Sequence, residues 1–337
     1  MHKRAVEEVI GDVDLKKWRV LKVRVDEDGK SRLWLAPRKD EINWEEVLKK
    51  TIAQMKAWSP SKRKFRKQLS PSKRRERTML ELDVFDVHLG VRSWAIETGV
   101  NEDVEISSEK FLDTIDHLLS LSKPFPAKVV LFPVGNDFLH IDNVENTTKR
   151  GTSVDVDTRI TKIFERGKLL LVEAISRILD VAEKVIVPVI PGNHDETSMF
   201  FLGHVLAAWF RNSGRVTVDF SPRPRKYFRW GQGLNGFTHG SEEKLERLPM
   251  VMAEEAKRDW SQTKFHVWKI GHLHHPRKFL LPVAGSVEGV VIEQCGALVS
   301  RDAWHTRKGY VFQLPEASAT VWDLEQGPIA KFFHRVV

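Results

Sequence analysis

A run of apolar, mostly β-branched residues that ends abruptly in polar ones is the feature that most constrains the fold. Residues 184–190 read Lys-Val-Ile-Val-Pro-Val-Ile, and Pro191-Gly192 separates them from Asn193-His194-Asp195. This pattern predicts a buried strand with three polar side chains beyond its carboxyl end. Ligands of α/β proteins bind at that end, where rigid strands place side chains reproducibly. We therefore expect an α/β fold with a polar site beyond the sheet.

Four further short segments carry side chains of the same chemical kind. Together they supply carboxylate, imidazole and amide groups, and no thiolate, which is the ligand mixture that manganese, iron or zinc accepts. They offer more donors than one ion can use, so two ions sharing one carboxylate is the simplest interpretation. The segments are Asp86-Val87-His88, Gly135-Asn136-Asp137, Thr238-His239-Gly240 and Gly271-His272-Leu273-His274.

In this order the motifs resemble those of the calcineurin-like metallophosphoesterases, whose pattern runs Asp-x-His, Gly-Asp, Gly-Asn-His-Asp/Glu, His and Gly-His-x-His. The similarity covers roughly residues 80 to 280. It implies an α/β fold, a four-layer sandwich of two mixed β-sheets flanked by helices. It also implies two divalent metal ions as cofactors. We expect Mn²⁺, with iron, zinc and magnesium as alternatives.

The resemblance also implies a ligand set in which one carboxylate bridges the two ions. Asn136 could take the bridging position in place of Asp137, but a site between two dications needs an anion, so we prefer Asp137. A shift of one residue in the last motif would bring in His275 instead of its neighbour. The implied ligands are Asp86, His88, Asp137 and His274 for one ion, and Asp137, Asn193, His239 and His272 for the other.

Within this superfamily the chain looks most like the SbcD-type DNA nucleases, because the residues from Asp137 to His140 are similar to their Gly-Asp-x-x-His block. That similarity implies a catalytic role for His140 near the scissile phosphate. His194 would face the leaving-group oxygen as a general acid or transition-state stabiliser, and Asp195 would orient its ring. The tail of about sixty residues after the last motif is too short for the capping domain and partner-binding extension of that type. We therefore expect no ATPase partner, and the pattern is compatible with a phage-encoded enzyme.

These motifs predict a phosphodiesterase, and most specifically a nuclease that hydrolyses DNA or RNA by attack of a metal-activated hydroxide on phosphorus. The choice between exonuclease and endonuclease stays open. Two alternatives also stay open: a phosphomonoesterase acting on phosphoprotein or nucleotide, and a nucleic-acid-binding protein that has lost turnover. No P-loop lysine motif and no Gly-x-Ser-x-Gly elbow occurs in the sequence.

The net charge of +8 is concentrated at the N-terminus. Residues 1–80 contain 23 lysines and arginines against 12 acidic residues, and residues 62–77 contain nine against Glu76 alone. Such a run is either a solvated linker or an arm that binds nucleic-acid phosphates. The residues that we name as candidate substrate contacts are Lys62, Arg63, Lys73 and Arg74 in this run, and Arg150 and Arg159 in the polar loop 141–162.

Three segments follow from the change in composition. Residues 1–58 predict a small ββα module, with a hairpin of strands 18–25 and 31–36 and a helix from Asn43 to about Trp58. Residues 59–77 form the basic linker, and residues 78–337 form the metallophosphoesterase domain.

Periodicity places the motifs on elements of this last domain. We expect Thr78 to His88 to be one strand with Asp86 and His88 on its core-facing side. The other expected helices are 108–122, 163–183 and one from Thr197 or Ser198 to residue 210. The other expected strands are 129–134, a hairpin around 231–236 that delivers His239, and 287–299 with 310–314 as closing strands of the second sheet.

A single cysteine, Cys295, excludes an intramolecular disulfide and favours a reducing compartment. No apolar run approaches the ~20 residues of a transmembrane helix, and the first residues lack an apolar signal core. We therefore expect a cytoplasmic protein that does not bind membranes.

Overall fold

The computed structural model describes residues 18–25, 31–37, 44–57, 76–274, 277–282, 289–312 and 314–336. The chain divides into two compact units, Met1–Ala53 and Gln54–Val337. Nearly all of the expected basic linker 59–77 lies outside the described residues, as do its four candidate contacts Lys62, Arg63, Lys73 and Arg74.

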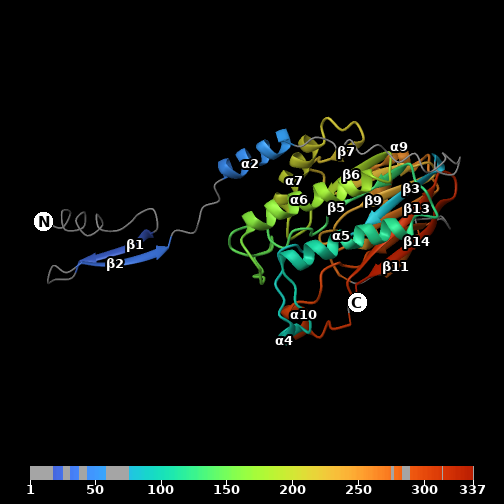
Figure 1. The fold of residues 1–337 in the computed structure, drawn as a ribbon. Coiled ribbons are helices and arrows are strands. Elements are labelled where there is room, and N and C mark those ends of the chain that lie inside the picture. Colours follow the sequence, from blue (N-terminus) through green and yellow to red (C-terminus); the bar gives the residue numbers. More distant parts are fainter. Residues whose placement is uncertain are drawn as a thin grey trace. The chain divides into compact units, whose positions relative to one another are not determined.

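The N-terminal unit contains the predicted hairpin. Strands β1 (Trp18–Val25) and β2 (Ser31–Pro37) pair antiparallel as a two-stranded sheet (Figure 1). Helix α2 (Trp44–Ala57) begins in this unit and ends in the next. The hairpin and the helix therefore lie where the alternation and the Asn43 cap predicted them.

The first sheet of the large unit has seven strands and is mixed. Its order is β14-β13-β3-β4-β6-β5, with β7 on the other edge of β6. The central strands run parallel, whereas β13 is antiparallel to both of its neighbours. The strands are β3 (Thr78–Asp83), β4 (Val129–Leu131), β5 (Val134–Gly135), β6 (Lys184–Ile190), β7 (Val216–Asp219), β13 (Glu316–Asp323) and β14 (Gly327–Arg335).

The second sheet has five strands in the order β11-β12-β10-β9-β8 and is also mixed. Strand β10 is parallel to both neighbours, while β8 and β11 pair antiparallel at the two edges. The strands are β8 (Lys226–Trp230), β9 (Gly233–Phe237), β10 (Phe265–Ile270), β11 (Arg277–Pro282) and β12 (Gly289–Gln294).

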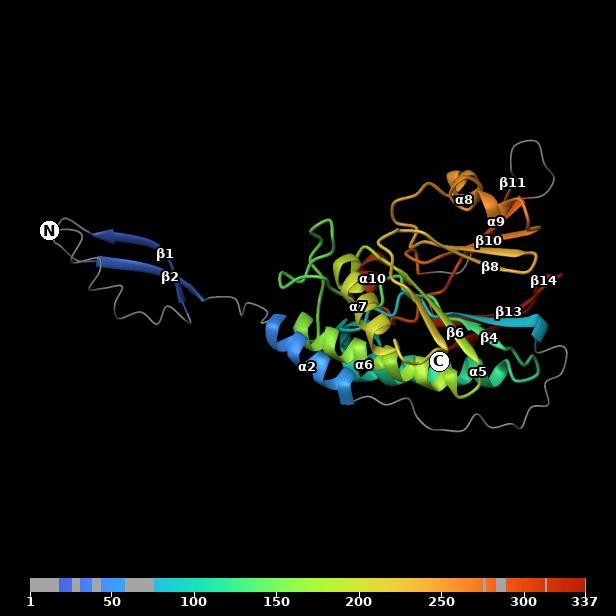
Figure 2. The same ribbon diagram turned by 90° about the horizontal axis from the view of Figure 1, so that it is seen from above.

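The two sheets pack face to face, and helices cover their outer faces (Figure 2). Met79 and Leu131 of the first sheet and Phe237 and Val267 of the second share one buried cluster. Burying these apolar faces removes them from water, which is the main stabilising contribution to such a sandwich. The predicted four-layer α/β architecture of two mixed sheets flanked by helices is confirmed.

Helices α5 (Val104–Leu121), α6 (Ile160–Leu179) and α7 (Glu196–Trp209) lie against the first sheet. Their buried faces are apolar at helical spacing, as in Phe111, Ile115 and Leu118 of α5. Helix α8 (Leu248–Glu255) covers the second sheet, where Leu248 and Met252 pack against Trp268. Short helices α4 (Ala95–Thr98), α9 (Lys257–Trp260) and α10 (Ala303–Lys308) complete the described helices, with a 3-10 turn, η1 (Leu245–Arg247).

Two predictions about elements were wrong. The described residues of the range, 310–312 and 314, lie in no strand, and the strands that complete the structure, β13 and β14, join the first sheet rather than the second. The expected strand from Thr78 to His88 ends at Asp83. Beyond Asp83 the backbone leaves the extended conformation, and Asp86 and His88 adopt positive φ.

Candidate metal centre

Five motif segments meet at the carboxyl ends of strands from both sheets. Asp86 and His88 follow β3, Asp137 follows β5, and residues 193–195 follow β6; His239 follows β9, and residues 272–274 follow β10. Backbone hydrogen bonds join the segments directly, from Asp86 N to the carbonyl of Asn136 (3.0 Å) and from His88 N to the carbonyl of Asp137 (2.9 Å). The site is therefore assembled on the ends of rigid strands.

The donor residues adopt a backbone conformation that side chains with a Cβ rarely take. The φ angles of Asp86, His88, Asp137, His272 and His274 are 48°, 47°, 61°, 71° and 58°. Left-handed φ at a histidine is sterically unfavourable, and such strain concentrates at functional sites. The period-two spacing therefore predicted correctly that Asp86 and His88 both point into the site. It predicted the wrong backbone conformation, because the two residues lie in tight turns and not in an extended strand.

The first group of donors consists of Asp86, His88 and His274, whose ligand atoms all lie within 4.8 Å of one another. The Nε2 atoms of His88 and His274 are 3.1 Å apart. Asp86 Oδ1 lies 3.9 Å from the first and 3.5 Å from the second. Three lone-pair atoms thus converge on one point, and a cation there would be coordinated by all of them.

The second group consists of Asp137, His239 and His272. His239 Nε2 lies 3.0 Å from Asp137 Oδ2 and 2.7 Å from the side-chain oxygen of Asn193. The predicted amide ligand Asn193 therefore stands beside this group. The structure thus brings the seven sequence-predicted ligands together: six form the two groups, and Asn193 stands beside the second.

Asp137 stands between the groups, and Asn136 does not. Asp137 Oδ2 is 3.0 Å from His239 Nε2 of the second group and 4.0 Å from His88 Nε2 of the first. Asn136 instead approaches the opposite ring nitrogen of His239, with 2.7 Å between its Oδ1 and Nδ1. It therefore orients a donor residue. His275, the other residue left open by the sequence, lies outside the described residues.

Close packing holds Asp137 in place. A Cβ atom at Gly192 would overlap its Oδ1. That oxygen also accepts the backbone N–H of His194, at 2.8 Å. The glycine of the Gly-Asn-His-Asp motif thus lets the β6 turn come into contact with the carboxylate.

Burial and neighbouring charge set the protonation of the donors. Burial lowers the pKa of His274 to about 3 and that of His272 to about 4, so both rings are neutral, as metal ligands must be. Burial raises the pKa of Asp86 to about 8. Although burial opposes the shift, Asp137 raises the pKa of His239 to about 9, and His239 in turn holds the pKa of Asp137 below its usual range.

These observations fit bound metal. A proton on His239 balances the Asp137 charge in the free chain, and a divalent ion in the second group would take its place. The donor set consists of imidazole, carboxylate and amide atoms, which suits manganese, iron or zinc. Among the described residues, the side chains therefore form groups that could hold metal ions.

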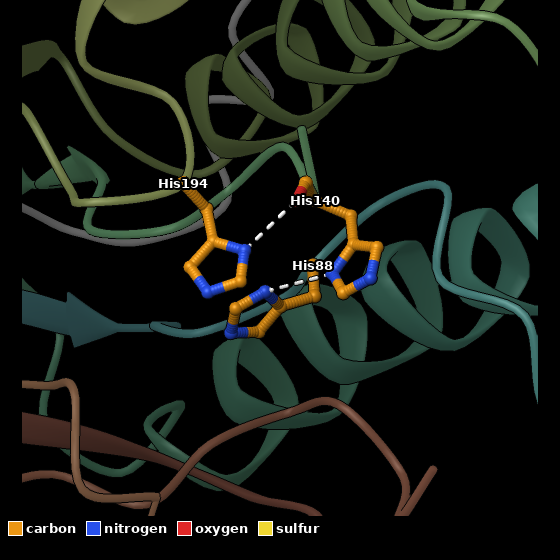
Figure 3. A group of neighbouring side chains, drawn as sticks. All are labelled: His88, His140 and His194. Atoms are coloured by element: carbon orange, nitrogen blue, oxygen red, sulfur yellow. Dashed lines mark hydrogen bonds between the residues drawn. The ribbon is translucent and has the colours of Figure 1, made fainter. Parts of the chain in front are cut away.

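His194 and His140 lie beside His88 of the first group (Figure 3), and the ligand atoms of these three histidines also lie within 4.8 Å of one another. The His194 ring donates from Nδ1 to the carbonyl oxygen of His140, at 2.8 Å. The Nδ1 atoms of His140 and His88 are 3.2 Å apart. His140 thus contacts two other residues of the site, and burial lowers its pKa to about 3.

The structure differs from the prediction for Asp195. The ring of His194 is held by the His140 carbonyl, and both Asp195 oxygens accept backbone N–H groups, from Gly192 at 2.9 Å and from Leu139 at 3.0 Å. Asp195 is fully buried and joins the turn after β5 to the turn after β6. Asp195 was expected to contact His194 because the two are adjacent in sequence. In the fold it pairs instead with two buried backbone N–H groups that would otherwise have no hydrogen-bond partner.

The donor groups open into a cavity of about 1110 Å³. Arg150 lines it, with its guanidinium 3.7 Å from Glu242. Arg159 does not line it and instead precedes α6 as its N-cap residue. Of the two arginines proposed from the loop, the structure brings only Arg150 to the site.

Sequence reasoning assigned no role to Asp302 and His305, which also line this cavity. The ring of His305 stacks on that of His274, with centroids 5.2 Å apart, and its Nδ1 is 2.7 Å from Asp302 Oδ1. No short motif surrounds these residues. The Asp-x-x-His spacing at the start of a helix is the one signal that could have indicated them.

No protein-family model and no curated protein matches the sequence. Among solved structures, a Vps29 double mutant from Entamoeba histolytica is similar at 11% identity, with a TM-score of 0.32, over 77% of this chain and 100% of that chain. Vps29 from Chaetomium thermophilum, complexed with a cyclic peptide, is similar at 11% identity and a TM-score of 0.29, over 77% and 96% of the two chains. The assignment of the site therefore depends on its own geometry. Among the described residues, no helix combines the length and the apolar character needed to cross a membrane.

Proposed function

We propose that the chain is a metal-dependent phosphodiesterase that hydrolyses nucleic acid. The observation that carries this proposal is the pair of donor groups that meet at Asp137, with the His194 ring beside them in the same cavity. An isolated metal site needs one group. Two groups that share an anion are suited to phosphoryl transfer, where attacking and leaving oxygens both develop charge.

The first ion would be held by Asp86, His88 and His274, the second by Asn193, His239 and His272, and both by Asp137. When bound, such ions polarise phosphoryl oxygens and lower the pKa of water. The contribution of the protein is to fix the donors before substrate arrives. The buried turns that carry them supply that rigidity.

His194 is the residue that we assign to the leaving group. Because a carbonyl oxygen can only accept, the 2.8 Å contact with His140 requires a proton on Nδ1 of His194. Its Nε2 is then the atom available to the substrate. A proton on Nε2 would be donated to the departing oxygen, as in general acid catalysis.

His140 acts through its neighbours in this proposal. Its carbonyl fixes His194, and its ring lies against Nδ1 of His88, the nitrogen that does not face the first group. Partners of this kind orient ligands and tune their basicity. We therefore assign His140 a positioning role in place of the direct role near the scissile phosphate that the sequence suggested.

Size and charge favour a polymer over a small phosphomonoester. The cavity is large, and cationic side chains line its walls, among them Arg150, Arg307 and Arg335. A phosphomonoester presents one phosphoryl group, whereas a polynucleotide places phosphates at intervals that separated cations can contact. The basic run at residues 62–77 supports the same substrate class.

The test is hydrolysis of labelled DNA and RNA by purified protein with Mn²⁺, comparing wild type with His194→Ala. We expect His194→Ala to lose roughly 10²–10⁴ in kcat on a polynucleotide and to keep its metal content. Hydrolysis of a nitrophenyl phosphodiester should be nearly unchanged, because that leaving group needs no proton.

His204→Ala is the matched control, since His204 packs between Phe200 and Phe220 away from the cavity. It should behave as wild type in both assays. Phosphomonoester turnover without polynucleotide turnover would refute the proposal, and so would polynucleotide binding without hydrolysis.

A further inference from the structure

Three exposed aromatic side chains form one wall of the cavity that contains the donor groups. Trp304 belongs to α10, and Tyr310 and Phe312 follow it; all three line the cavity. Their exposed fractions are 49%, 57% and 95%. We call these three residues the aromatic wall. Exposed apolar rings gathered inside a hollow, rather than scattered singly, indicate a binding surface.

The wall is continuous with the first donor group. His305 stacks on His274, and Trp304 meets His305 edge to face with centroids 5.1 Å apart. Tyr310 follows, with its ring 5.8 Å from that of Trp304. A series of rings therefore runs from a donor residue outward along one side of the cavity.

The backbone fixes this arrangement. The Asp302 side chain accepts the N–H of His305 at 2.8 Å and caps α10. Gly309, at φ 80°, ends the helix and reverses the chain, and the N–H of Tyr310 then donates to the carbonyl of His305 at 2.9 Å. Only a residue tolerant of left-handed φ permits this reversal, so the loop returns Tyr310 onto Trp304.

The chemistry of the wall points to a nucleobase. Each base has a π-face that stacks on aromatic rings, largely without regard to sequence. Arg307 projects from the same helix and lines the same cavity, and its Nε donates to the carbonyl oxygen of Ala303 at 3.3 Å. A base attached to a phosphate at the donor groups would have rings and a cation within reach. A duplex keeps its bases stacked on one another and cannot offer these faces.

We propose that Trp304, Tyr310 and Phe312 bind an unstacked nucleobase beside the phosphate held at the donor groups, so that the site takes single-stranded nucleic acid. This inference rests on the proposed function and adds the substrate class. A second copy of the chain or an apolar peptide would fit exposed rings on an open surface better than rings within a cavity lined by arginines.

The test is binding of the full chain to a fluorescein-labelled oligothymidylate and to a matched duplex, by anisotropy in EDTA. Chelation prevents hydrolysis and contacts between the ions and phosphate, so the affinity reports the contribution of the wall. Tyr310→Ala and Phe312→Ala should each weaken oligothymidylate binding by about 5- to 150-fold, the range for loss of one base–aromatic stack. Phe312→Tyr should keep wild-type affinity. Trp94→Ala is the matched control, because Trp94 is 59% exposed and lies outside this cavity.

Unchanged oligothymidylate affinity in both alanine variants would overturn the proposal. Equal weakening of duplex and single strand would overturn it too, as would a change in self-association without a change in affinity. Hydrolysis of methyl p-nitrophenyl phosphate, which has no base, is measured in parallel with Mn²⁺ and should be the same in all variants. If wild type fails to hydrolyse any diester, the proposed function fails, and the EDTA binding data still decide the role of the wall.

Discussion

Replacement of Asp195 separates two explanations of the Gly-Asn-His-Asp motif. In the structure its carboxylate accepts the backbone N–H groups of Gly192 and Leu139. Asp195→Ala would leave both amides buried without a partner. Two hydrogen bonds to a charged group contribute roughly 3–6 kcal/mol. Burial raises the pKa of Asp195 well above its usual range, and this cost of burying the carboxylate offsets part of the contribution of the hydrogen bonds. We therefore expect Asp195→Ala to lower the free energy of unfolding by about 3 kcal/mol.

That loss corresponds to a fall in Tm of roughly 6–12 °C for a domain of this size. Because Gly192 is in close contact with Asp137, the same substitution should displace the shared carboxylate and reduce metal content. Differential scanning fluorimetry and elemental analysis of purified protein measure the two effects.

Asp142→Ala is the matched control. Asp142 also accepts two backbone N–H groups, from Thr197 at 2.8 Å and Ser198 at 2.7 Å, but at the exposed start of α7. Loss of such a cap costs about 1 kcal/mol, and it should leave the metal content unchanged. If Asp195→Ala keeps its Tm and its metal while losing polynucleotide turnover, Asp195 acts through His194 and our account of it is wrong.

Two further predictions concern the core and the N-terminus. In the core, three carboxylates surround Lys269: Glu81, Asp83 and Glu293, at 3.2, 3.1 and 2.7 Å. Lys269→Met should lower stability by about 3–5 kcal/mol, because it leaves buried carboxylates without their cation, whereas Lys331→Met, at a side chain that is 27% exposed, should cost much less. The loss of unfolding free energy in Lys269→Met, measured by urea unfolding, should be smaller at pH 5 than at pH 8. Without the cation the pKa values of the buried carboxyl groups rise above their usual range, so these groups take up protons in the folded variant as the pH falls, and its stability increases. An equal loss at both pH values would contradict this. If six or more cations of the basic run contact phosphates, the affinity for nucleic acid should fall by about 10³ or more between 50 and 200 mM salt. Deleting residues 1–77 should make this fall less steep. Equal salt dependence in the full and shortened chains would show that the basic run is a solvated linker.

The sequence predicted the sheets best where apolar residues form an unbroken run. Strand β6 begins and ends where expected, at Lys184 and Ile190, because most of its residues are β-branched and Pro191-Gly192 ends it. Strand β13 was missed because its alternation is weak: small Ala317 and Ala319 alternate with Ser318 and Thr320, and the polar residues are buried as well. Their partners, Asp83 and Lys269, come from distant strands, and no local pattern shows them.

The donor residues were predictable from motif order, but the conformation that presents them was not. Left-handed φ at Asp86 and His88 accompanies tertiary hydrogen bonds of their own backbone N–H groups, to the carbonyls of Asn136 at 3.0 Å and Asp137 at 2.9 Å. The contacts of Asp195 depend in the same way on two turns that meet only in the fold. Asp302 and His305 reach the cavity from a part of the sequence without a motif.

The metal content of Asp137→Asn, compared with that of Asp86→Asn, tests the central claim most directly. Asp137 lies within 4.0 Å of donor atoms in both groups, whereas Asp86 belongs to the first group alone. Elemental analysis after loading with Mn²⁺ should find two ions in wild type, one in Asp86→Asn, and a loss from both groups in Asp137→Asn. Both variants keep a side chain of the same shape, and matching Tm values of the metal-free proteins confirm that they fold. Two ions retained in Asp137→Asn, or loss of both ions in Asn136→Ala alone, would contradict a centre built around Asp137.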